Sequence, residues 1–105
     1  MEGIFYAKNL MHVISRKALQ KFWEKYPNSE SSLSHWFKAV KNSDFLNFND
    51  LRLAFPSADR VDDLIVFNIS GNKYRLIASV HFKRGKVYIR HLLTHSEYDR
   101  GVWKK

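Results

Sequence analysis

The spacing of hydrophobic residues divides the chain into a helical first half and an extended second half. Between residues 16 and 43, apolar residues recur every three or four positions, which is the spacing of one face of a helix. From Leu64 onward the period changes to two, the spacing of one face of a strand. The pattern predicts an α+β domain, with two N-terminal helices packed on one face of a small, mainly antiparallel sheet.

The helical half is expected to follow a short β-like run, His12–Ser15. Ser15 would cap a first helix that starts at Arg16 and is stopped by Pro27. Asn28 or Ser29 would cap a second helix, which closes at residues 41–43. Each helix carries one apolar stripe that is expected to pack in the core. The stripes consist of Leu19, Phe22, Trp23 and Tyr26, and of Leu33, Trp36, Phe37 and Val40.

The extended half is expected to contain three strands, at residues 64–70, 73–82 and 86–93. Gly71-Asn72 and Arg84-Gly85 separate them and have the composition of two-residue hairpin turns, because Gly and Asn tolerate positive φ. With these turns, residues 66–69 pair with 77–74, and residues 73–82 pair with 96–87. Residues 44–62 are interpreted as a long loop with one helical turn near Asp50–Ala54.

Alternation of side chains then assigns the strand residues to two faces. The apolar face, expected to meet the helices, collects Ile65, Phe67, Ile69, Tyr74, Leu76, Ala78, Val80, Phe82, Val87, Ile89 and Leu93. The other face collects Val66, Asn68, Lys73, Arg75, Ile77, Ser79, His81, Tyr88, Arg90, Leu92 and Thr94. His91 falls on the core side and is interpreted as a structural histidine. His95 and Tyr98 follow the last strand and are expected to turn toward the rim of the cationic face.

Length and composition narrow the class of protein. A chain of 105 residues suits one domain, and the absence of cysteine excludes disulfides and thiolate metal sites. No apolar run reaches the ~18 residues that span a bilayer, and no secretory signal is recognised at the start, so we expect a cytoplasmic protein without membrane contact. Met11 directly precedes the first structural unit. Residues 1–10 are therefore interpreted as an N-terminal extension or tail, and residues 11–105 as the domain.

The charge of the chain points to a polyanionic partner. There are 18 Lys and Arg residues against 10 Asp and Glu, giving a formal net charge of +8. A small, basic, aromatic-rich domain of this kind usually binds nucleic acid, although charge that only confers solubility is the alternative. The polar face of the first helix carries Arg16, Lys17, Lys21 and Lys25. In the long loop, Arg60 is a candidate RNA contact, or else a surface arginine paired with Asp59 or Asp62.

The cationic face of the sheet suits cleavage of single-stranded RNA. Arginine and lysine bind phosphates, and tyrosine and histidine stack on bases and move protons. RNA supplies its own nucleophile, the 2′-OH, so no metal or other cofactor is expected. His91 and His95 lie ~13 Å apart on a strand, too far to bind one metal ion. Solvated surface charge is the alternative interpretation of Lys73, Arg75, His81 and Arg90.

Five segments resemble the HigB toxins of bacterial type II toxin–antitoxin systems, which belong to the RelE-like superfamily. They are MHVISRKAL (11–19), WEKYP (23–27), FPSADRV (55–61), VFNISGNKYRLIA (66–78) and YIRHLLTHSEYD (88–99). The resemblance runs in order over residues 11–103. It implies an mRNA interferase that cuts mRNA, typically in the translating ribosome, through a 2′,3′-cyclic phosphate. It also implies a HigA antitoxin with a helix-turn-helix domain, and contact with operator DNA only through the toxin–antitoxin pair.

The resemblance also assigns expected roles to residues. Arg75 matches the strand arginine that RelE-like toxins use at the scissile phosphate, and Tyr98 matches their C-terminal tyrosine, which stacks on a base or assists proton transfer. His95 stands where that group places a basic or titratable side chain. RelE itself uses lysines on the preceding strand, where this chain has Val66 and Asn68. His95 is therefore expected to act as base or acid, with Lys73 and Arg90 as electrostatic partners. The further candidate RNA contacts are Arg60, Asn68, His81, Arg84 and Tyr88.

Two other functions remain open from the sequence. A ParE-like gyrase poison belongs to the same superfamily and would not need His95 or Tyr98. A non-catalytic RNA-binding module would use the same cationic face without cutting its ligand.

Overall fold

The structure, a computed structural model, describes residues 10–104, excluding the side chain of Val102. The extension expected at residues 1–10 lies outside the described part except for Leu10. The elements in chain order are β1 (His12–Ile14), α1 (Lys17–Lys25), the 3₁₀ helix η1 (Pro27–Ser29), α2 (Glu30–Lys41), α3 (Phe48–Ala54), β2 (Asp59–Val61), β3 (Leu64–Ile69), β4 (Tyr74–His81), η2 (Phe82–Arg84), β5 (Lys86–Thr94), α4 (His95–Arg100) and η3 (Val102–Lys104).

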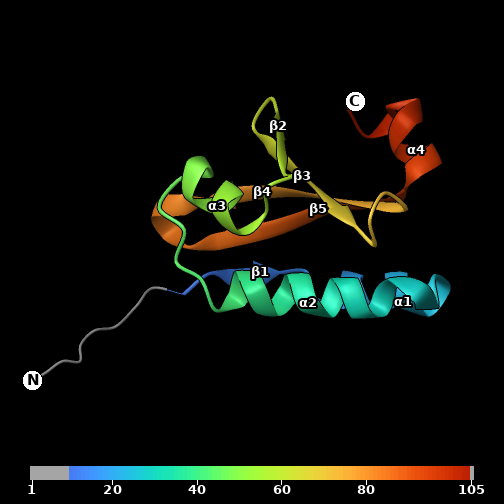
Figure 1. Cartoon of the computed structure of the whole chain (residues 1–105), viewed down its shortest axis with the longest axis horizontal. Coiled ribbons are helices and arrows are strands. Elements are labelled where there is room, and N and C mark those ends of the chain that lie inside the picture. Colours follow the sequence, from blue (N-terminus) through green and yellow to red (C-terminus); the bar gives the residue numbers. More distant parts are fainter. Residues whose placement is uncertain (1–9, 105) are drawn as a thin grey trace, which may run out of the picture.

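A five-stranded sheet carries the fold, with strand order β1-β5-β4-β3-β2. β1 runs parallel to β5, and the other neighbours are antiparallel, which confirms the α+β class. Figure 1 shows α1 and α2 along one side of the sheet, with α4 at its end on the other side. Both predicted stripes contribute to the core between helices and sheet. Leu19, Leu33, Trp36 and Val40 are buried there with Phe67 and Leu76 of the sheet.

The two N-terminal helices begin slightly differently from the expectation. Arg16, not Ser15, holds the N-cap position of α1. Ser15 precedes it in a left-handed conformation, with φ of +74°, and its carbonyl accepts a hydrogen bond from the Ala18 N–H at 2.9 Å. Ser29 holds the N-cap position of α2, as one of the two candidates predicted. Its buried hydroxyl donates to the carbonyl of Tyr26 at 2.7 Å and so joins the end of α1 to the start of α2.

Residues 44–62 are more ordered than the predicted long loop. Helix α3 begins at Phe48, and the side chain of Asn47 caps it by accepting the Asp50 N–H at 2.9 Å. Strand β2 then pairs with β3, with Arg60 opposite Ile65. A strand of three residues is too short for a two-residue period to be recognised, which explains why the sequence pattern did not reveal it.

The pairing of β3 with β4 agrees with the predicted register, since Val66 lies opposite Ile77 and Ile69 opposite Tyr74. The turn between the strands is longer than the two residues expected. It spans residues 70–73, and Ser70 and Gly71 both have positive φ, at +53° and +69°.

The pairing of β4 with β5 differs from the predicted register. The expected turn at Arg84-Gly85 is instead η2 followed by Gly85, whose φ is +64°. His81 therefore pairs with Lys86, two residues away from the expected partner. A bulge between Ile77 and Ala78 then reduces the offset, so that Ile77 pairs with His91, one residue away from the expected partner. An offset of two keeps every side chain on its predicted face, whereas an offset of one exchanges the faces.

Four assignments at the far end of β5 are therefore wrong. Thr94, predicted on the cationic face, pairs with Tyr74, whose side chain lies in the main core. Leu92, predicted on the cationic face, packs against the main core. Leu93, predicted in the core, lies on the opposite face against a small second cluster formed by Val66, Ile77 and Trp103. His91, predicted on the core side, also lies on that opposite face, with its ring centroid 6.5 Å from that of Trp103.

Candidate active site

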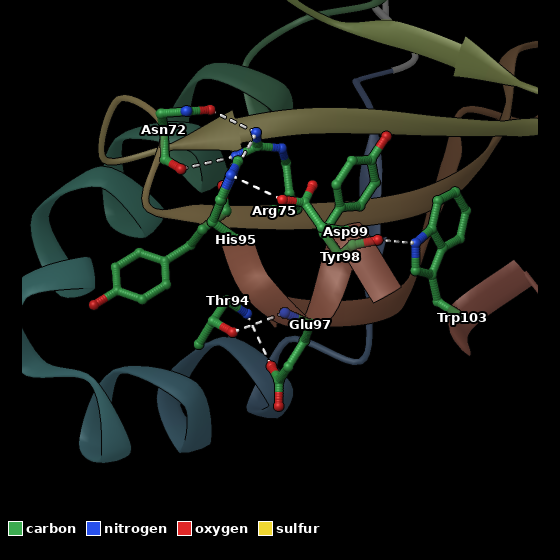
Figure 2. A network of polar contacts seen from close by, with 9 residues as sticks. Asn72, Arg75, Thr94, His95, Glu97, Tyr98, Asp99 and Trp103 are labelled. Carbon is green, nitrogen blue, oxygen red and sulfur yellow. Dashed lines mark hydrogen bonds and ion pairs between the residues drawn. The ribbon is translucent and has the colours of Figure 1, made fainter. Parts of the chain in front are cut away.

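The C-terminal helix brings the key side chains together. Thr94 ends β5 and begins α4 through a capping box, in which Thr94 Oγ1 accepts the Glu97 N–H at 3.2 Å and Glu97 Oε1 accepts the Thr94 N–H at 2.9 Å. Gly101 ends the helix with φ of +70°. Residues 95–100 thus form a helix, which the sequence pattern did not predict. Figure 2 shows α4 beside the start of β4, facing Arg75.

Arg75 is the centre of this site. Its side chain is only 7% exposed, and neutral acceptors surround its guanidinium. Nη1 donates to the carbonyls of Asn72 and Tyr74 at 3.1 and 3.2 Å, and Nη2 donates to Asn72 Oδ1 at 2.5 Å. Nη2 also lies 3.2 Å from Nδ1 of His95. These contacts hold a buried cation in one orientation next to the imidazole.

The two ring nitrogens of His95 have different partners. Arginine can only donate, so the Nδ1 atom of His95 must accept from Arg75 through its lone pair. The Nε2 atom, 3.0 Å from Asp99 Oδ2, then carries the proton and donates it to that carboxylate. His95 and Asp99 are one helical turn apart in α4, and their side chains are 45% and 59% exposed. His95 is therefore in its Nε2–H tautomer. It is partly exposed, whereas the neighbouring Arg75 is buried.

Tyr98 completes the site on the other side of Arg75. The Arg75 Cζ atom lies 5.1 Å from the centroid of the Tyr98 ring, within the range of a cation–π contact. The ring is stacked on Trp103 with 5.2 Å between centroids and 13° between planes. The Trp103 Nε1–H donates to the Tyr98 carbonyl at 3.2 Å, which fixes α4 against η3. We call Asn72, Arg75, His95, Tyr98 and Asp99 the α4 cluster.

Three residues that support this site are absent from the sequence-based candidates. Asn72 and Asp99 bind Arg75 and His95 directly, and Trp103 supports Tyr98. The T-x-x-E pattern of Thr94–Glu97 was the signal that predicts a helix here. Recognising that helix would have placed His95 and Asp99, at positions i and i+4, on one face.

Lys73 and Asn68 lie close to the α4 cluster, as expected for the cationic face. The Lys73 carbonyl accepts the His95 N–H at 2.8 Å, so the exposed Lys73 lies beside the first residue of α4. Asn68 is also exposed, and it is the direct cross-strand partner of Arg75. The exposed side chains of Lys73 and Asn68 can therefore contact a ligand that binds beside the Arg75–His95 pair.

Four of the other candidates gather at the opposite end of the sheet face. His81 and Tyr88 contact each other edge to face at 5.1 Å, and the Arg90 guanidinium lies 5.1 Å from the centroid of the Tyr88 ring. Arg84 follows three residues after His81, at the end of η2. We call His81, Arg84, Tyr88 and Arg90 the hairpin cluster. His81 is six residues along β4 from Arg75, or ~20 Å. Arg90 lies at the bulge of β5, and its described contact is with Tyr88 rather than with Arg75, His95 or Tyr98.

Arg60 does not lie on the cationic face. In β2 it is paired with Ile65, whose side chain points into the main core, so Arg60 projects to the helical side of the sheet. There its guanidinium lies 5.9 Å from the centroid of the Phe48 ring in α3. Arg60 therefore lies on the other side of the sheet from Arg75, and its role as an RNA contact stays a prediction.

Residues 10–104 contain no group of three or more His, Cys, Asp or Glu side chains placed to hold one metal ion, and no helix with the length and apolar character to cross a bilayer. The α4 cluster does combine a fixed cation, an imidazole with a defined tautomer and an aromatic ring, with the cation in contact with each of the other two. This combination can neutralise a phosphate, transfer a proton and stack on a base within the width of one nucleotide.

Comparison with known proteins agrees with this chemistry. The family model for HigB toxins, the RelE-like toxic component of a toxin–antitoxin system, matches residues 29–101. The chain belongs to the HigB toxin family. It is 39% identical over 92 residues to the mRNA interferase toxin HigB of Escherichia coli K12, covering 85% of this chain and 88% of that protein. It is 31% identical over 93 residues to the mRNA interferase HigB of Escherichia coli O6:H1, covering 86% and 90%.

The match to the HigB family covers every element of the α4 cluster. The family model extends from the end of η1 to Gly101 and so includes the residues from Asn72 to Asp99. As the toxic component of a toxin–antitoxin system, this HigB-family chain has an antitoxin as its partner.

Proposed function

We propose that this HigB-family toxin is an mRNA interferase, as its relatives are named, and that the α4 cluster is its cleavage site. The observation that carries the proposal is the direct contact between Arg75, His95 and Tyr98, which come from two separate elements of the fold. In the proposed reaction, the 2′-oxygen of RNA attacks the adjacent phosphorus and the bond to the 5′-oxygen breaks. The products are a 2′,3′-cyclic phosphate and a 5′-hydroxyl.

Each residue has a distinct role in this proposal. Arg75 binds the nonbridging oxygens and neutralises the charge that develops on the phosphorane. His95 transfers a proton, either from the 2′-OH or to the leaving 5′-oxygen, and Tyr98 stacks on a base beside the scissile phosphate. Lys73, exposed at the turn beside His95, adds positive charge where the RNA backbone would enter.

The contacts in the free protein indicate the change that must accompany substrate binding. Both nitrogens of His95 are bonded, one to Arg75 and one to Asp99, so neither is free to exchange a proton with RNA. A phosphate oxygen binds a guanidinium more strongly than a neutral imidazole does, because it carries a negative charge. We propose that the RNA phosphate takes the place of His95 at Arg75 and so frees Nδ1, while Asp99 keeps the imidazole oriented.

We propose for this protein the cellular setting that its resemblance to the HigB toxins implies. We propose that the toxin acts in the cytoplasm on mRNA in translating ribosomes, through the domain of residues 11–105. The proposed antitoxin is of the HigA type with a helix-turn-helix domain, and operator DNA is contacted only through the complex. The net charge of +8 supports association with ribosomal and messenger RNA.

Expression in bacteria followed by mapping of mRNA 5′ ends tests this proposal. We expect codon-linked breaks in mRNA that disappear in His95→Ala. His35→Ala is the matched control, because His35 is an exposed histidine on α2, on the other side of the sheet. Accumulating DNA breaks would instead support a ParE-like gyrase poison. RNA association without any breaks would support a non-catalytic RNA-binding module.

A further inference from the structure

A groove of about 720 Å³ lies between α1 and α2, in the helical layer. Leu19, Trp23 and Phe37 line it with apolar surface, and Trp23 and Phe37 are only partly buried by the rest of the domain. In Figure 1 this layer lies on the side of the sheet opposite α4. The groove therefore takes no part in the α4 cluster and is open to a separate ligand.

The rim of the groove is positively charged on both helices. Arg16 and Lys17 line it from the α1 side, and Lys38 and Lys41 line it from α2. All four side chains are exposed, and the residues that line the groove, each within the described part of the chain, include no Asp or Glu. An apolar channel between two basic edges is complementary to an amphipathic segment with acidic flanks.

A second hollow extends this surface toward β1. It measures about 330 Å³ and shares Arg16, Phe37 and Lys41 with the groove. It adds Leu10, which is 45% exposed, and His12 at the edge of the sheet. The combined surface is long enough for about three turns of helix, since the 12 residues of α2 span ~18 Å.

The aromatic contacts in the groove favour a protein ligand over RNA. The guanidinium of Arg16 lies 4.6 Å from the centroid of the Phe37 ring, and the ammonium of Lys41 lies 5.8 Å from it. These cations lie over the Phe37 ring, so the basic edges and the apolar channel form one continuous surface. Aliphatic side chains would fill the space between Leu19 and Trp23, whereas nucleotides have no such groups. Aromatic residues and arginine are also the commonest anchors of protein–protein interfaces.

We infer that the groove between α1 and α2 is the docking site for an acidic, amphipathic helix of the antitoxin. Apolar residues of that helix, spaced at i, i+3 or i+4, and i+7, would fill the channel, and carboxylates on both sides would pair with Arg16, Lys17, Lys38 and Lys41. The inference rests on membership of the toxin family and on this surface. It is independent of the catalytic roles proposed for the α4 cluster.

Charge reversal tests the docking site. The cognate antitoxin is titrated into purified toxin carrying Lys38→Glu and Lys41→Glu. We expect binding about 100-fold weaker than to the wild type, because two attractive pairs become repulsive. Lys21→Glu with Lys25→Glu is the matched control: it makes the same charge change on exposed residues of α1 that do not line the groove. We expect it to weaken binding less than about threefold, since only long-range attraction is lost.

A crosslinking experiment checks the ligand directly. Gln20 lines the groove and is exposed, so p-benzoylphenylalanine placed there should crosslink to the antitoxin, and mass spectrometry should locate the crosslink in an acidic, amphipathic segment. The same probe at His35, on α2 but outside the groove, should give no such product. A crosslink to a segment without acidic residues, or none at all, would overturn the inference.

Cleavage of mRNA by the same variants separates this inference from the proposed function. The Lys38→Glu, Lys41→Glu toxin should cut mRNA like the wild type and should resist neutralisation by the antitoxin. Unchanged antitoxin binding would overturn the inference, and loss of RNA association with unchanged antitoxin binding would identify the groove as a nucleic-acid surface instead. If the wild-type toxin cut no RNA at all, the proposed function would fail while the binding result would stand.

Discussion

The two ends of one sheet face carry similar residues in opposite states. At the α4 end, Arg75 is 7% exposed and His95 has partners on both ring nitrogens. At the hairpin end, His81, Arg84 and Arg90 are exposed, and their described contacts are mainly between neighbouring rings and cations. The difference shows that a cationic residue on this face is not by itself evidence of a catalytic role. The number of groups that hold it in place is more informative.

The cause of the difference lies in the segment that comes after each strand. After β5 the capping box starts α4, and the stacked pair of Tyr98 and Trp103 holds this helix against the sheet. After β4 the chain only turns through η2 and Gly85. Groups held rigidly stabilise a transition state without reorganising, whereas exposed cations mainly position the RNA backbone. We therefore propose that the α4 cluster carries out cleavage and that the hairpin cluster holds the substrate.

Removal of one arginine from each end should give the largest difference between them. We expect Arg75→Ala to lower the cleavage rate by about 100- to 1000-fold, the cost of losing one fixed donor to a developing negative charge. Arg90→Ala should lower it by less than about tenfold, because Arg90 only helps to hold the substrate. Single-turnover kinetics of both variants measure this difference. Equal losses would show that the two ends do not have separate roles.

Arg75→Ala should leave the domain folded. Water can replace the guanidinium at the exposed Asn72, and the one buried acceptor that is freed, the Tyr74 carbonyl, should cost about 1–3 kcal/mol. Circular dichroism and thermal unfolding check this point. An unfolded variant would mean that Arg75 is mainly structural.

Removal of one aromatic residue from each end tests the difference in packing. Trp103 is 6% exposed and covers Val66 and Ile77, so Trp103→Ala should lower the free energy of unfolding by about 3 kcal/mol. Tyr88→Ala should cost less than about 1 kcal/mol, because Tyr88 is only partly buried. Urea denaturation gives both values. A larger loss at Tyr88 than at Trp103 would contradict the description of the α4 end as the packed one.

Removal of the helix cap tests the α4 end with a smaller change. Thr94→Ala removes the side-chain oxygen that accepts the Glu97 N–H, and should lower the free energy of unfolding by about 1 kcal/mol. It should also lower cleavage activity, because His95 is the first residue of the capped helix. Ser96→Ala, a change at an exposed neighbour in α4, is the control and should alter neither quantity measurably. Full activity in Thr94→Ala would indicate that α4 need not be fixed for cleavage.

The salt dependence of RNA binding gives the smallest and most specific signal. If Arg90 neutralises one phosphate, Arg90→Ala should reduce the slope of log K against log salt concentration by about 0.7 with single-stranded RNA. Fluorescence anisotropy with labelled single-stranded RNA at several salt concentrations measures the slope. An unchanged slope would remove Arg90 from the RNA surface.

The sequence predicted the layers of the fold because their periods are long and regular. The stripes of α1 and α2 and the alternation in β3 and β4 each extend over enough residues to be distinguished from chance. Short elements were missed for the opposite reason, as with β2, which has three residues. The bulge near Ile77 was not predictable either, because its position depends on the geometry of η2 and on packing rather than on local composition.

For the candidate site, the sequence identified the central side chains but not the residues that hold them in place. Arg75, His95 and Tyr98 were named, and the structure brings all three into contact. Arg90 was grouped with them by strand alternation, and Arg60 was named as a cation of the long loop. The positions of both depend on strand pairing that the sequence pattern did not reveal. Asn72 and Asp99 were missed because their importance arises from the tertiary contact of a turn with a helix. Only the helix cap at Thr94 had a local signal.

The decisive measurement is the single-turnover cleavage rate of His95→Ala at saturating mRNA on translating ribosomes, with His35→Ala as control. We predict a loss of at least about 100-fold, typical of removing a group that transfers a proton, with a thermal unfolding curve like that of the wild type. His35→Ala should cleave normally, and the wild-type products should carry 5′-hydroxyl ends. A folded His95→Ala toxin that cuts within about threefold of the wild-type rate, much less than that expected loss, would contradict the assignment of cleavage to the α4 cluster.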